Sequence, residues 1–220
     1  GSPHAPPKAD FFWVEKEDLQ ELQALILRMV CERIPEAYGL DPMTEVQVLT
    51  PMHKGEVGTV ILNRLLQERL NPDGRELVRG QRAFREGDRI LQLRNNYDKD
   101  VFNGDLGRIV SIDAQDEVLT AEFDGREVEY GFDELDEIGL AYAISVHKSQ
   151  GSEYPAVVMP VVTQHYMLLQ RNLIYTGLTR ARKLAVLMGS RRAMHMGLGN
   201  ERGRQRHTSL AVRLAKESQT

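Results

Sequence analysis

The stretch from Leu140 to Val162, LAYAISVHKSQGSEYPAVVMPVV, has two apolar runs on either side of a short polar loop. The runs Leu140–Val146 and Ala156–Val162 are rich in alanine and β-branched residues and alternate little, which is typical of parallel strands buried on both faces. The loop between them carries hydroxyls, an imidazole, an ammonium and one carboxylate. This pattern predicts an α/β domain with polar groups at the end of a buried strand.

The flanking sequence continues the α/β pattern. Val46–Thr50 is predicted as a short strand, with a loop over residues 51–58 and an amphipathic helix over residues 60–70 after it. Leu184–Met188 is a third buried run of the same kind. Helical spacing of apolar residues predicts a further helix over residues 19–34, which is expected to end before the next proline.

The middle of the chain has a different pattern. Short strands with tight turns are expected at Arg89–Leu93, Gly107–Ile112, Val118–Phe123 and Glu127–Gly131. The dipeptide Asp124-Gly125 suits a two-residue hairpin between the last two. We therefore expect a lead-in or tag at residues 1–9, a discontinuous α/β domain at residues 10–80 and 138–220, and an inserted small antiparallel barrel at residues 84–137.

Charge is distributed unevenly along the chain. The 220 residues carry 28 basic and 32 acidic side chains, a formal net charge of -4, which argues against a uniformly basic coat for nucleic acid. Residues 113–137 hold eleven acidic side chains and one basic, whereas residues 171–220 hold eleven basic and two acidic. A polyanion is therefore expected to bind outside residues 113–137. The C-terminal part holds a run of basic residues, which fits a solvated tail as well as it fits a binding surface. These residues are Arg191, Arg192, Arg202, Arg204 and Arg206.

Several classes of protein are excluded by composition. One cysteine, Cys31, rules out an internal disulfide framework and a cysteine-based zinc site, and the six scattered histidines predict no metal site. The longest apolar runs are too short to span a membrane, so a cytoplasmic location is expected. The opening Gly1-Ser2 is interpreted as a tag remnant, and the chain as a piece of something longer.

The polar loop Ser145–Glu153 is the first candidate site. Its hydroxyls, imidazole and lysine can bind phosphate oxygens, Gly151 allows close backbone approach, and Glu153 suits a ribose hydroxyl or a metal-bound water. A capped turn without function is the alternative.

The segment Tyr175–Lys183 is the second candidate site. Its Arg180 and Arg182 fit either ordinary surface charge or an arginine finger, a guanidinium that stabilises charge on a transferred phosphoryl group. The sequence contains no Gly-x-x-x-x-Gly-Lys-Ser/Thr loop and no strand that ends in an acidic pair for Mg²⁺. The chain alone is therefore not expected to hydrolyse ATP.

Blocks in a fixed order carry a family resemblance: Gln47–Gly55, Leu62–Gln67 with Leu70–Pro72, Phe102–Gly107, Ser145–Glu153 and Leu173–Lys183. Together they resemble the C-terminal half of a RecD-like superfamily 1 DNA helicase, the group that includes the alpha subunit of exodeoxyribonuclease V. The resemblance covers residues 10–189, and the loop and the Thr-Arg-Ala turn are its most specific parts.

The resemblance implies a second RecA-like domain, with a parallel sheet of the type found in P-loop NTPases, and an inserted Src-homology-3-like barrel. It implies movement 5′ to 3′ along single-stranded DNA. ATP and Mg²⁺ would bind only together with a first RecA-like domain of the same parent chain. Repair or recombination proteins are further implied partners, and association with the bacterial nucleoid is the implied location.

Roles for individual residues follow from the same resemblance. Arg180 would be the arginine finger. Gly151, Glu153 and Lys54 would face the nucleotide, and the residues at or near the DNA backbone would be Ser145, His147, Lys148 and Ser149. Closure on ATP and opening after hydrolysis would move the DNA by about a nucleotide per cycle.

Two other functions are alternatives to that of a helicase. One is a non-catalytic module that binds single-stranded nucleic acid or a protein through the small barrel. The other, a metabolic α/β enzyme, lacks a nucleophile, a metal cluster and a dinucleotide glycine fingerprint.

Overall fold

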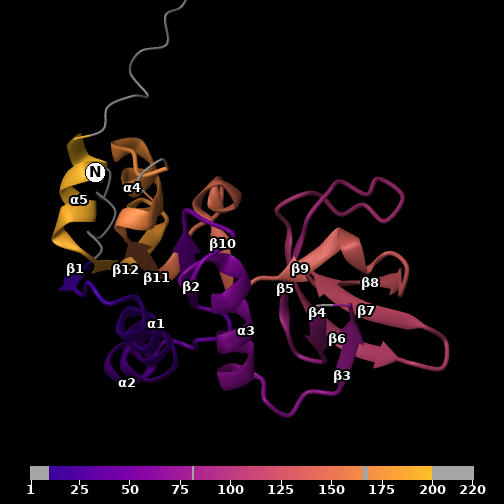
Figure 1. Cartoon of the computed structure of the whole chain (residues 1–220). Helices are drawn as coiled ribbons and strands as arrows, with labels where there is room; N and C mark the ends of the chain where they lie inside the picture. Colours follow the sequence, from indigo (N-terminus) through magenta and orange to yellow (C-terminus); the bar gives the residue numbers. More distant parts are fainter. Residues whose placement is uncertain (1–9, 81, 166–167, 200–220) are drawn as a thin grey trace, which may run out of the picture.

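The computed structural model describes residues 10–80, 82–165 and 168–199. Two units lie side by side, an α/β domain and a smaller domain of antiparallel strands (Figure 1). The lead-in at residues 1–9 and the arginines Arg202, Arg204 and Arg206 lie outside the described residues. The expected fold class, α/β with an inserted antiparallel unit, is confirmed.

A five-stranded parallel sheet forms the centre of the α/β domain. Its strands, in the order β1-β12-β11-β2-β10, are Asp10–Glu15, Ala181–Gly189, Tyr154–Val161, Val46–Thr50 and Ala143–Ser145. The predicted strand at residues 46–50 is confirmed, and the runs at 156–162 and 184–188 are the buried parts of longer strands. Burial on both faces explains why these runs do not alternate.

Helices cover both faces of this sheet (Figure 1). The helices on one face are α1 (Leu19–Arg28), the π-helical η1 (Met29–Arg33), α2 (Ile34–Tyr38) and α3 (Thr59–Leu70); α4 (Arg171–Leu178) and α5 (Arg191–Gly199) cover the other. The 3-10 turns are η2 (Leu135–Glu137), η3 (Val146–Ser149) and η4 (Thr163–His165). In the described part of the chain, no helix combines the length and apolar character needed to cross a membrane.

The first helix does not end before Pro35, as the sequence analysis expected. It passes through η1, where the Ile34 N–H donates to the Met29 carbonyl, and continues as α2 to Tyr38. Proline has no N–H, but it is tolerated in the first turn of a helix, where that donor has no partner to lose. The wider π turn restarts the hydrogen-bond pattern just before Pro35, so the prediction that the helix ends there was wrong.

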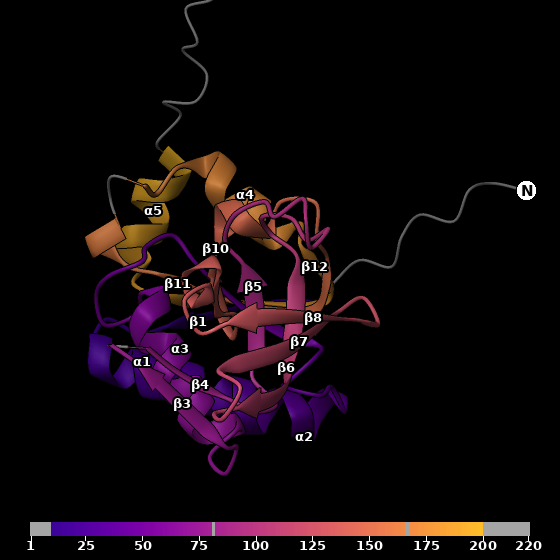
Figure 2. The same cartoon turned by 90° about the vertical axis from the view of Figure 1, so that its right-hand side faces the viewer.

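The inserted domain, named here the β domain, spans residues 76–140 (Figure 2). Its strands are β3 (Glu76–Arg79), β4 (Arg82–Arg85), β5 (Arg89–Gln92), β6 (Leu106–Asp113), β7 (Val118–Phe123), β8 (Arg126–Gly131) and β9 (Ile138–Leu140). Strands β8-β7-β6-β5-β9 form one antiparallel sheet, and β3 pairs with β4. Phe84, Tyr130 and Ile138 lie in a separate core, so β4 and β9 pack with this domain.

One predicted strand divides between the two domains. Leu140 ends β9 in the β domain, whereas Ala143 begins β10 in the parallel sheet. The apolar run at residues 140–146 is therefore not a single strand, because the chain changes sheets after Leu140.

A buried polar joint connects the two domains. The Asp88 carboxylate has no exposed surface and accepts hydrogen bonds from Gln67 Nε2 (2.6 Å), Asn71 Nδ2 (2.8 Å), Tyr142 Oη (2.9 Å) and the Arg85 N–H (2.7 Å). Burial raises the pKa of Asp88 above its ordinary value, although the hydrogen bonds oppose this.

The neighbouring Arg89 extends the joint into the parallel sheet. It donates from Nη1 to the Val46 carbonyl (2.8 Å) and from Nη2 to Gln47 Oε1 (2.7 Å). Because every partner of the Asp88 and Arg89 side chains is buried or half-buried, these contacts fix the β domain beside β2 and α3.

Candidate functional site

The polar loop connects opposite edges of the parallel sheet. Ser145 at the end of β10 is paired with Thr50 at the end of β2, which defines the carboxyl edge. Tyr154 at the start of β11 is paired with Ala181 at the start of β12, which defines the amino edge. Residues 146–153 therefore run from the carboxyl edge to the amino edge, and the candidate site has two parts.

The carboxyl-edge part begins with the turn η3. The Ser145 hydroxyl accepts a hydrogen bond from the Lys148 N–H (3.3 Å) and caps the turn, and the His147 side chain is exposed. Ser149 is fully buried, and its hydroxyl donates to the Val146 carbonyl (2.7 Å). The Ser149 hydroxyl thus shapes the turn and has no surface to offer a ligand, in contrast to the contact implied by the resemblance.

Lys148 connects this turn to the β domain. Its Nζ donates to Asn103 Oδ1 (3.0 Å), and burial lowers the pKa of its ammonium group. Over the described ranges, Lys148 forms no ion pair, so its charge is available to an incoming anion. Sequence reasoning missed the Asn103 contact, because the two residues are 45 positions apart.

Lys54 also lies at the carboxyl edge, in the loop between β2 and α3, and is exposed. The loop folds tightly on Gly58, where an added Cβ would lie 2.5 Å from the Lys54 carbonyl oxygen. This close approach requires glycine. The family resemblance implies that Lys54 faces the nucleotide together with Gly151 and Glu153. Those two residues, however, lie toward the other edge of the sheet.

The amino-edge part is built around Arg180, which follows α4. Its Nη1 donates to the Ser152 carbonyl (3.0 Å), and the Tyr154 N–H donates to the Arg180 carbonyl (2.8 Å). Its Nε is buried and has no hydrogen-bond partner within the described residues. A buried N–H without a partner is costly, so this guanidinium has bonding capacity left for a further acceptor.

A second arginine lies at the same edge. The Nε of Arg182 donates to Glu153 Oε2 (2.7 Å), and both side chains are largely exposed. Gly151 has a backbone φ of +87°, and an added Cβ there would meet no atom within 4 Å. The structure thus brings together Arg180, Arg182, Glu153 and the open backbone of Gly151, and the Glu153–Arg182 pair is a contact that the sequence analysis did not anticipate.

The chemistry of these groups fits part of a nucleotide. Two guanidiniums and an open glycine backbone are groups that can bind phosphate oxygens. No three His, Cys, Asp or Glu side chains of the described ranges are grouped so that they could share a metal ion.

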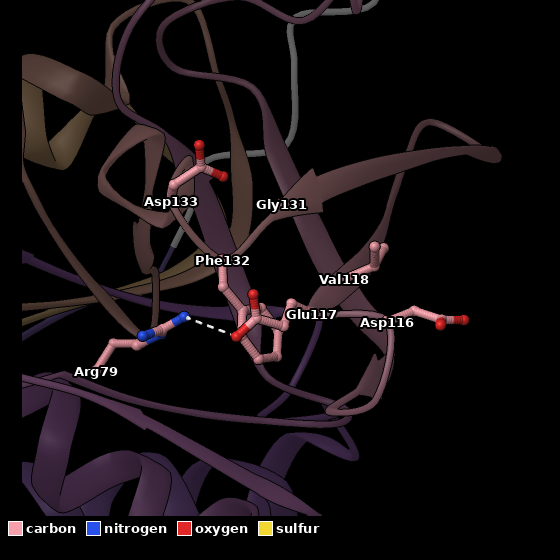
Figure 3. Close-up of a pocket in the computed structure, with 7 residues that line it drawn as sticks. All are labelled: Arg79, Asp116, Glu117, Val118, Gly131, Phe132 and Asp133. Atoms are coloured by element: carbon pink, nitrogen blue, oxygen red, sulfur yellow. Dashed lines mark ion pairs between the residues drawn. The ribbon is translucent and has the colours of Figure 1, made fainter.

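A hollow of about 550 Å³ lies in the β domain, away from both edges of the parallel sheet. Arg79 Nη2 lies 3.9 Å from a Glu117 carboxylate oxygen, and its guanidinium lies 5.0 Å from the centre of the Phe132 ring (Figure 3). Asp116 and Asp133 complete the rim and point away from each other (Figure 3). Three carboxylates against one arginine make this hollow unsuitable for a polyanion.

Comparison with known proteins gives two family matches. Residues 62–123 match the ATP-dependent RecD-like DNA helicase SH3 domain, and residues 140–188 match the UvrD-like helicase C-terminal domain. The two matches cover the β domain up to β7 and most of the parallel sheet with the candidate site.

Relatives give the same result. The chain is 40% identical over 169 residues to the ATP-dependent RecD2 DNA helicase of Deinococcus radiodurans, which is 77% of this chain and 23% of the relative. It is 26% identical over 209 residues to the RecBCD enzyme subunit RecD of Mycolicibacterium smegmatis, 92% of this chain and 36% of that protein. The chain thus spans between about a quarter and about a third of the length of these relatives.

One solved structure supports the fold. A Pif1 helicase from Bacteroides, crystallised with ADP-AlF3 and single-stranded DNA, superimposes with a TM-score of 0.51 at 18% identity. The match covers 76% of this chain and 46% of that chain.

Proposed function

This chain is homologous to the RecD-like DNA helicases, and we propose that it forms the C-terminal motor half of an ATP-dependent DNA helicase that moves 5′ to 3′. In this role it supplies an arginine finger and part of the track for single-stranded DNA. The proposal rests on one observation above all: residues 146–153 join the two edges of the sheet and end beside Arg180.

The amino edge is assigned to the nucleotide. Arg180 would leave the Ser152 carbonyl and donate to the phosphates of ATP bound to a first RecA-like domain, where a guanidinium stabilises charge on the transferred phosphoryl group. Gly151 and Glu153 lie at the same edge. When bound between the two domains, ATP would supply the energy of closure, and the first domain would supply the Mg²⁺ ligands and the phosphate loop. Without that domain, this chain binds no complete nucleotide and hydrolyses none.

The carboxyl edge is assigned to single-stranded DNA. Lys148 and His147 offer an ammonium and an imidazole to the backbone, and Lys54 extends the same edge. Ser145 acts through its cap on the turn η3. Because one loop of eight residues joins the two edges, release of the Ser152 carbonyl by Arg180 on nucleotide binding would free the loop that carries the DNA contacts. The acidic residues 113–137 speak against the alternative of a β domain that binds nucleic acid by itself.

The DNA assignment is tested by equilibrium binding of a fluorescent single-stranded oligonucleotide to this chain over a series of salt concentrations. Lys148→Ala is expected to weaken binding and to reduce the slope of log K against log salt by about 0.7, the value for one phosphate contact on a single strand. Lys183→Ala, which removes an exposed lysine at the amino edge, is the matched control and should change neither. Equal affinities and slopes for wild type and Lys148→Ala would refute the assignment of this edge.

A further inference from the structure

A small pocket of about 120 Å³ lies between the turn η3 and the helix α4. Figure 1 shows η3 above β10, between α4 and the β domain. The residues that line the pocket are Val146, His147, Gln150, Leu168, Gln170, Asn172, Leu173 and Thr176. The pocket lies at the carboxyl edge, where β10 ends and α4 begins.

The polar groups of the pocket are mainly carboxamides. Three carboxamides, those of Gln150, Gln170 and Asn172, line it together with one imidazole and one hydroxyl, and the lining residues that the structure describes include no lysine, arginine or carboxylate. No hydrogen bond within the described chain occupies any of the three carboxamides, whereas the Thr176 hydroxyl donates to the Asn172 carbonyl (2.7 Å). A carboxamide both donates and accepts, which matches the edge of a nucleobase, whereas a phosphate would select a cation.

The floor of the pocket is apolar. Val146 is fully buried and Leu173 is 7% exposed, while Leu168 stands at the rim with 40% of its surface exposed. Such side chains suit the face of a flat ring. The volume is far below the roughly 300–1,000 Å³ of sites that enclose a drug-sized ligand, so the pocket takes only a part of a larger molecule.

A cation lies next to the pocket on the same turn. Lys148 follows His147 directly, and the one hydrogen bond of its ammonium group within the described chain goes to the neutral Asn103. A positive charge beside an amide-lined pocket matches a nucleotide unit, in which an anionic phosphate is joined through a sugar to an uncharged base. A base is free to enter such a pocket only in a single strand, because pairing and stacking occupy its edge and faces in a duplex.

We propose that the pocket between η3 and α4 holds one unstacked base of the single strand while Lys148 contacts an adjacent phosphate. This inference rests on the proposed function, since it assumes that single-stranded DNA follows the carboxyl edge. It adds Gln150, Gln170 and Asn172 to the DNA contacts and makes binding depend on the bases as well as on the backbone.

The test compares two fluorescent oligonucleotides of equal length and charge, one of deoxythymidines and one with abasic sites in their place, titrated with this 220-residue chain. Wild type should bind the base-bearing strand about fivefold more tightly, which corresponds to one buried hydrogen-bonded group. Asn172→Ala and Gln170→Ala should weaken binding of the base-bearing strand and leave that of the abasic strand unchanged. Gln20→Ala, which truncates an exposed carboxamide on α1, should change neither.

Each result has a separate meaning. Equal affinity of wild type for both strands, or an equal loss for both strands in the pocket variants, would overturn the base pocket and leave the DNA track intact. Absence of binding to either strand would overturn the proposed DNA track together with the pocket. A loss on both strands in Lys148→Ala alone is the expected sign of a phosphate contact beside a base pocket.

Discussion

Replacing Asp88 by asparagine tests the joint that holds the β domain against the α/β domain. Oδ1 of Asp88 accepts from Asn71 and Tyr142, and Oδ2 accepts from Gln67 and the Arg85 N–H. Asparagine has nearly the same size but replaces one of these oxygens by an NH₂ group. Whichever way the new amide turns, two buried donors then face a third donor.

The expected loss follows from these contacts. With the NH₂ group in the place of Oδ2, the Arg85 N–H loses its acceptor, and Gln67 must turn its own amide and release the Ala83 carbonyl (3.0 Å). A buried polar group left without a partner costs about 1–3 kcal/mol, and removal of a desolvated charge offsets part of this. We expect Asp88→Asn to lower the free energy of unfolding by about 2–4 kcal/mol.

The loss should depend on pH in a defined direction. Burial raises the pKa of Asp88, so the folded chain holds this proton more tightly than the unfolded chain does. The contribution of Asp88 to stability is therefore greatest below the ordinary value of 3.8, and it falls as pH rises through the raised pKa. The difference in the free energy of unfolding between wild type and Asp88→Asn should therefore be smaller at pH 7 than at pH 4.

The assay is urea unfolding followed by far-ultraviolet circular dichroism, with free energies from linear extrapolation. Asp116→Asn, an exposed aspartate in the turn between β6 and β7, is the control and should stay within about 0.5 kcal/mol of wild type. A loss in Asp88→Asn no larger than that of the control would refute the reasoning that this carboxylate holds the joint.

Two further predictions concern stability. Burial lowers the pKa of His165 from 6.5 to about 4, so the unfolded chain takes up this proton first as pH falls, and wild type should lose up to about 3 kcal/mol between pH 6.5 and pH 4. His165→Leu should not show this loss in urea unfolding at the two pH values. An equal change in the free energy of unfolding for both proteins would contradict this prediction. Gly58→Ala places a Cβ 2.5 Å from the Lys54 carbonyl and should cost about 1–3 kcal/mol, measured as a lower Tm, whereas an unchanged Tm would show that the loop adapts freely.

Local sequence patterns predicted one strand that is buried on both faces and one helix with a single buried face. The strand at Val46–Thr50 and the helix at Thr59–Leu70 were found because a β-branched run and a helical stripe are each bounded by loop residues. The edge strand β1 was missed, since Phe11 and Phe12 are exposed and its ends are acidic. An edge strand gives no buried pattern to read.

Long-range contacts were beyond the reach of sequence reasoning. No local pattern shows that the chain changes sheets after Leu140, because strands of both domains are equally apolar there. The sequence named the candidate side chains but could not predict where they lie in the fold. The burial of Ser149, the position of Lys54 at the carboxyl edge and the contact of Lys148 with the β domain all depend on tertiary packing.

Whether Arg180 serves a nucleotide held between two domains is decided by ATP turnover in the longer helicase of which we propose this chain to be a part. Turnover would be measured with and without single-stranded DNA for wild type, for Arg180→Ala and for Arg192→Ala, a control in the exposed surface of α5. We expect DNA-stimulated turnover to fall by about 10³ to 10⁵ in Arg180→Ala, with DNA affinity unchanged, and to persist in the control. Wild-type turnover in Arg180→Ala would contradict the assignment of Arg180 to the nucleotide.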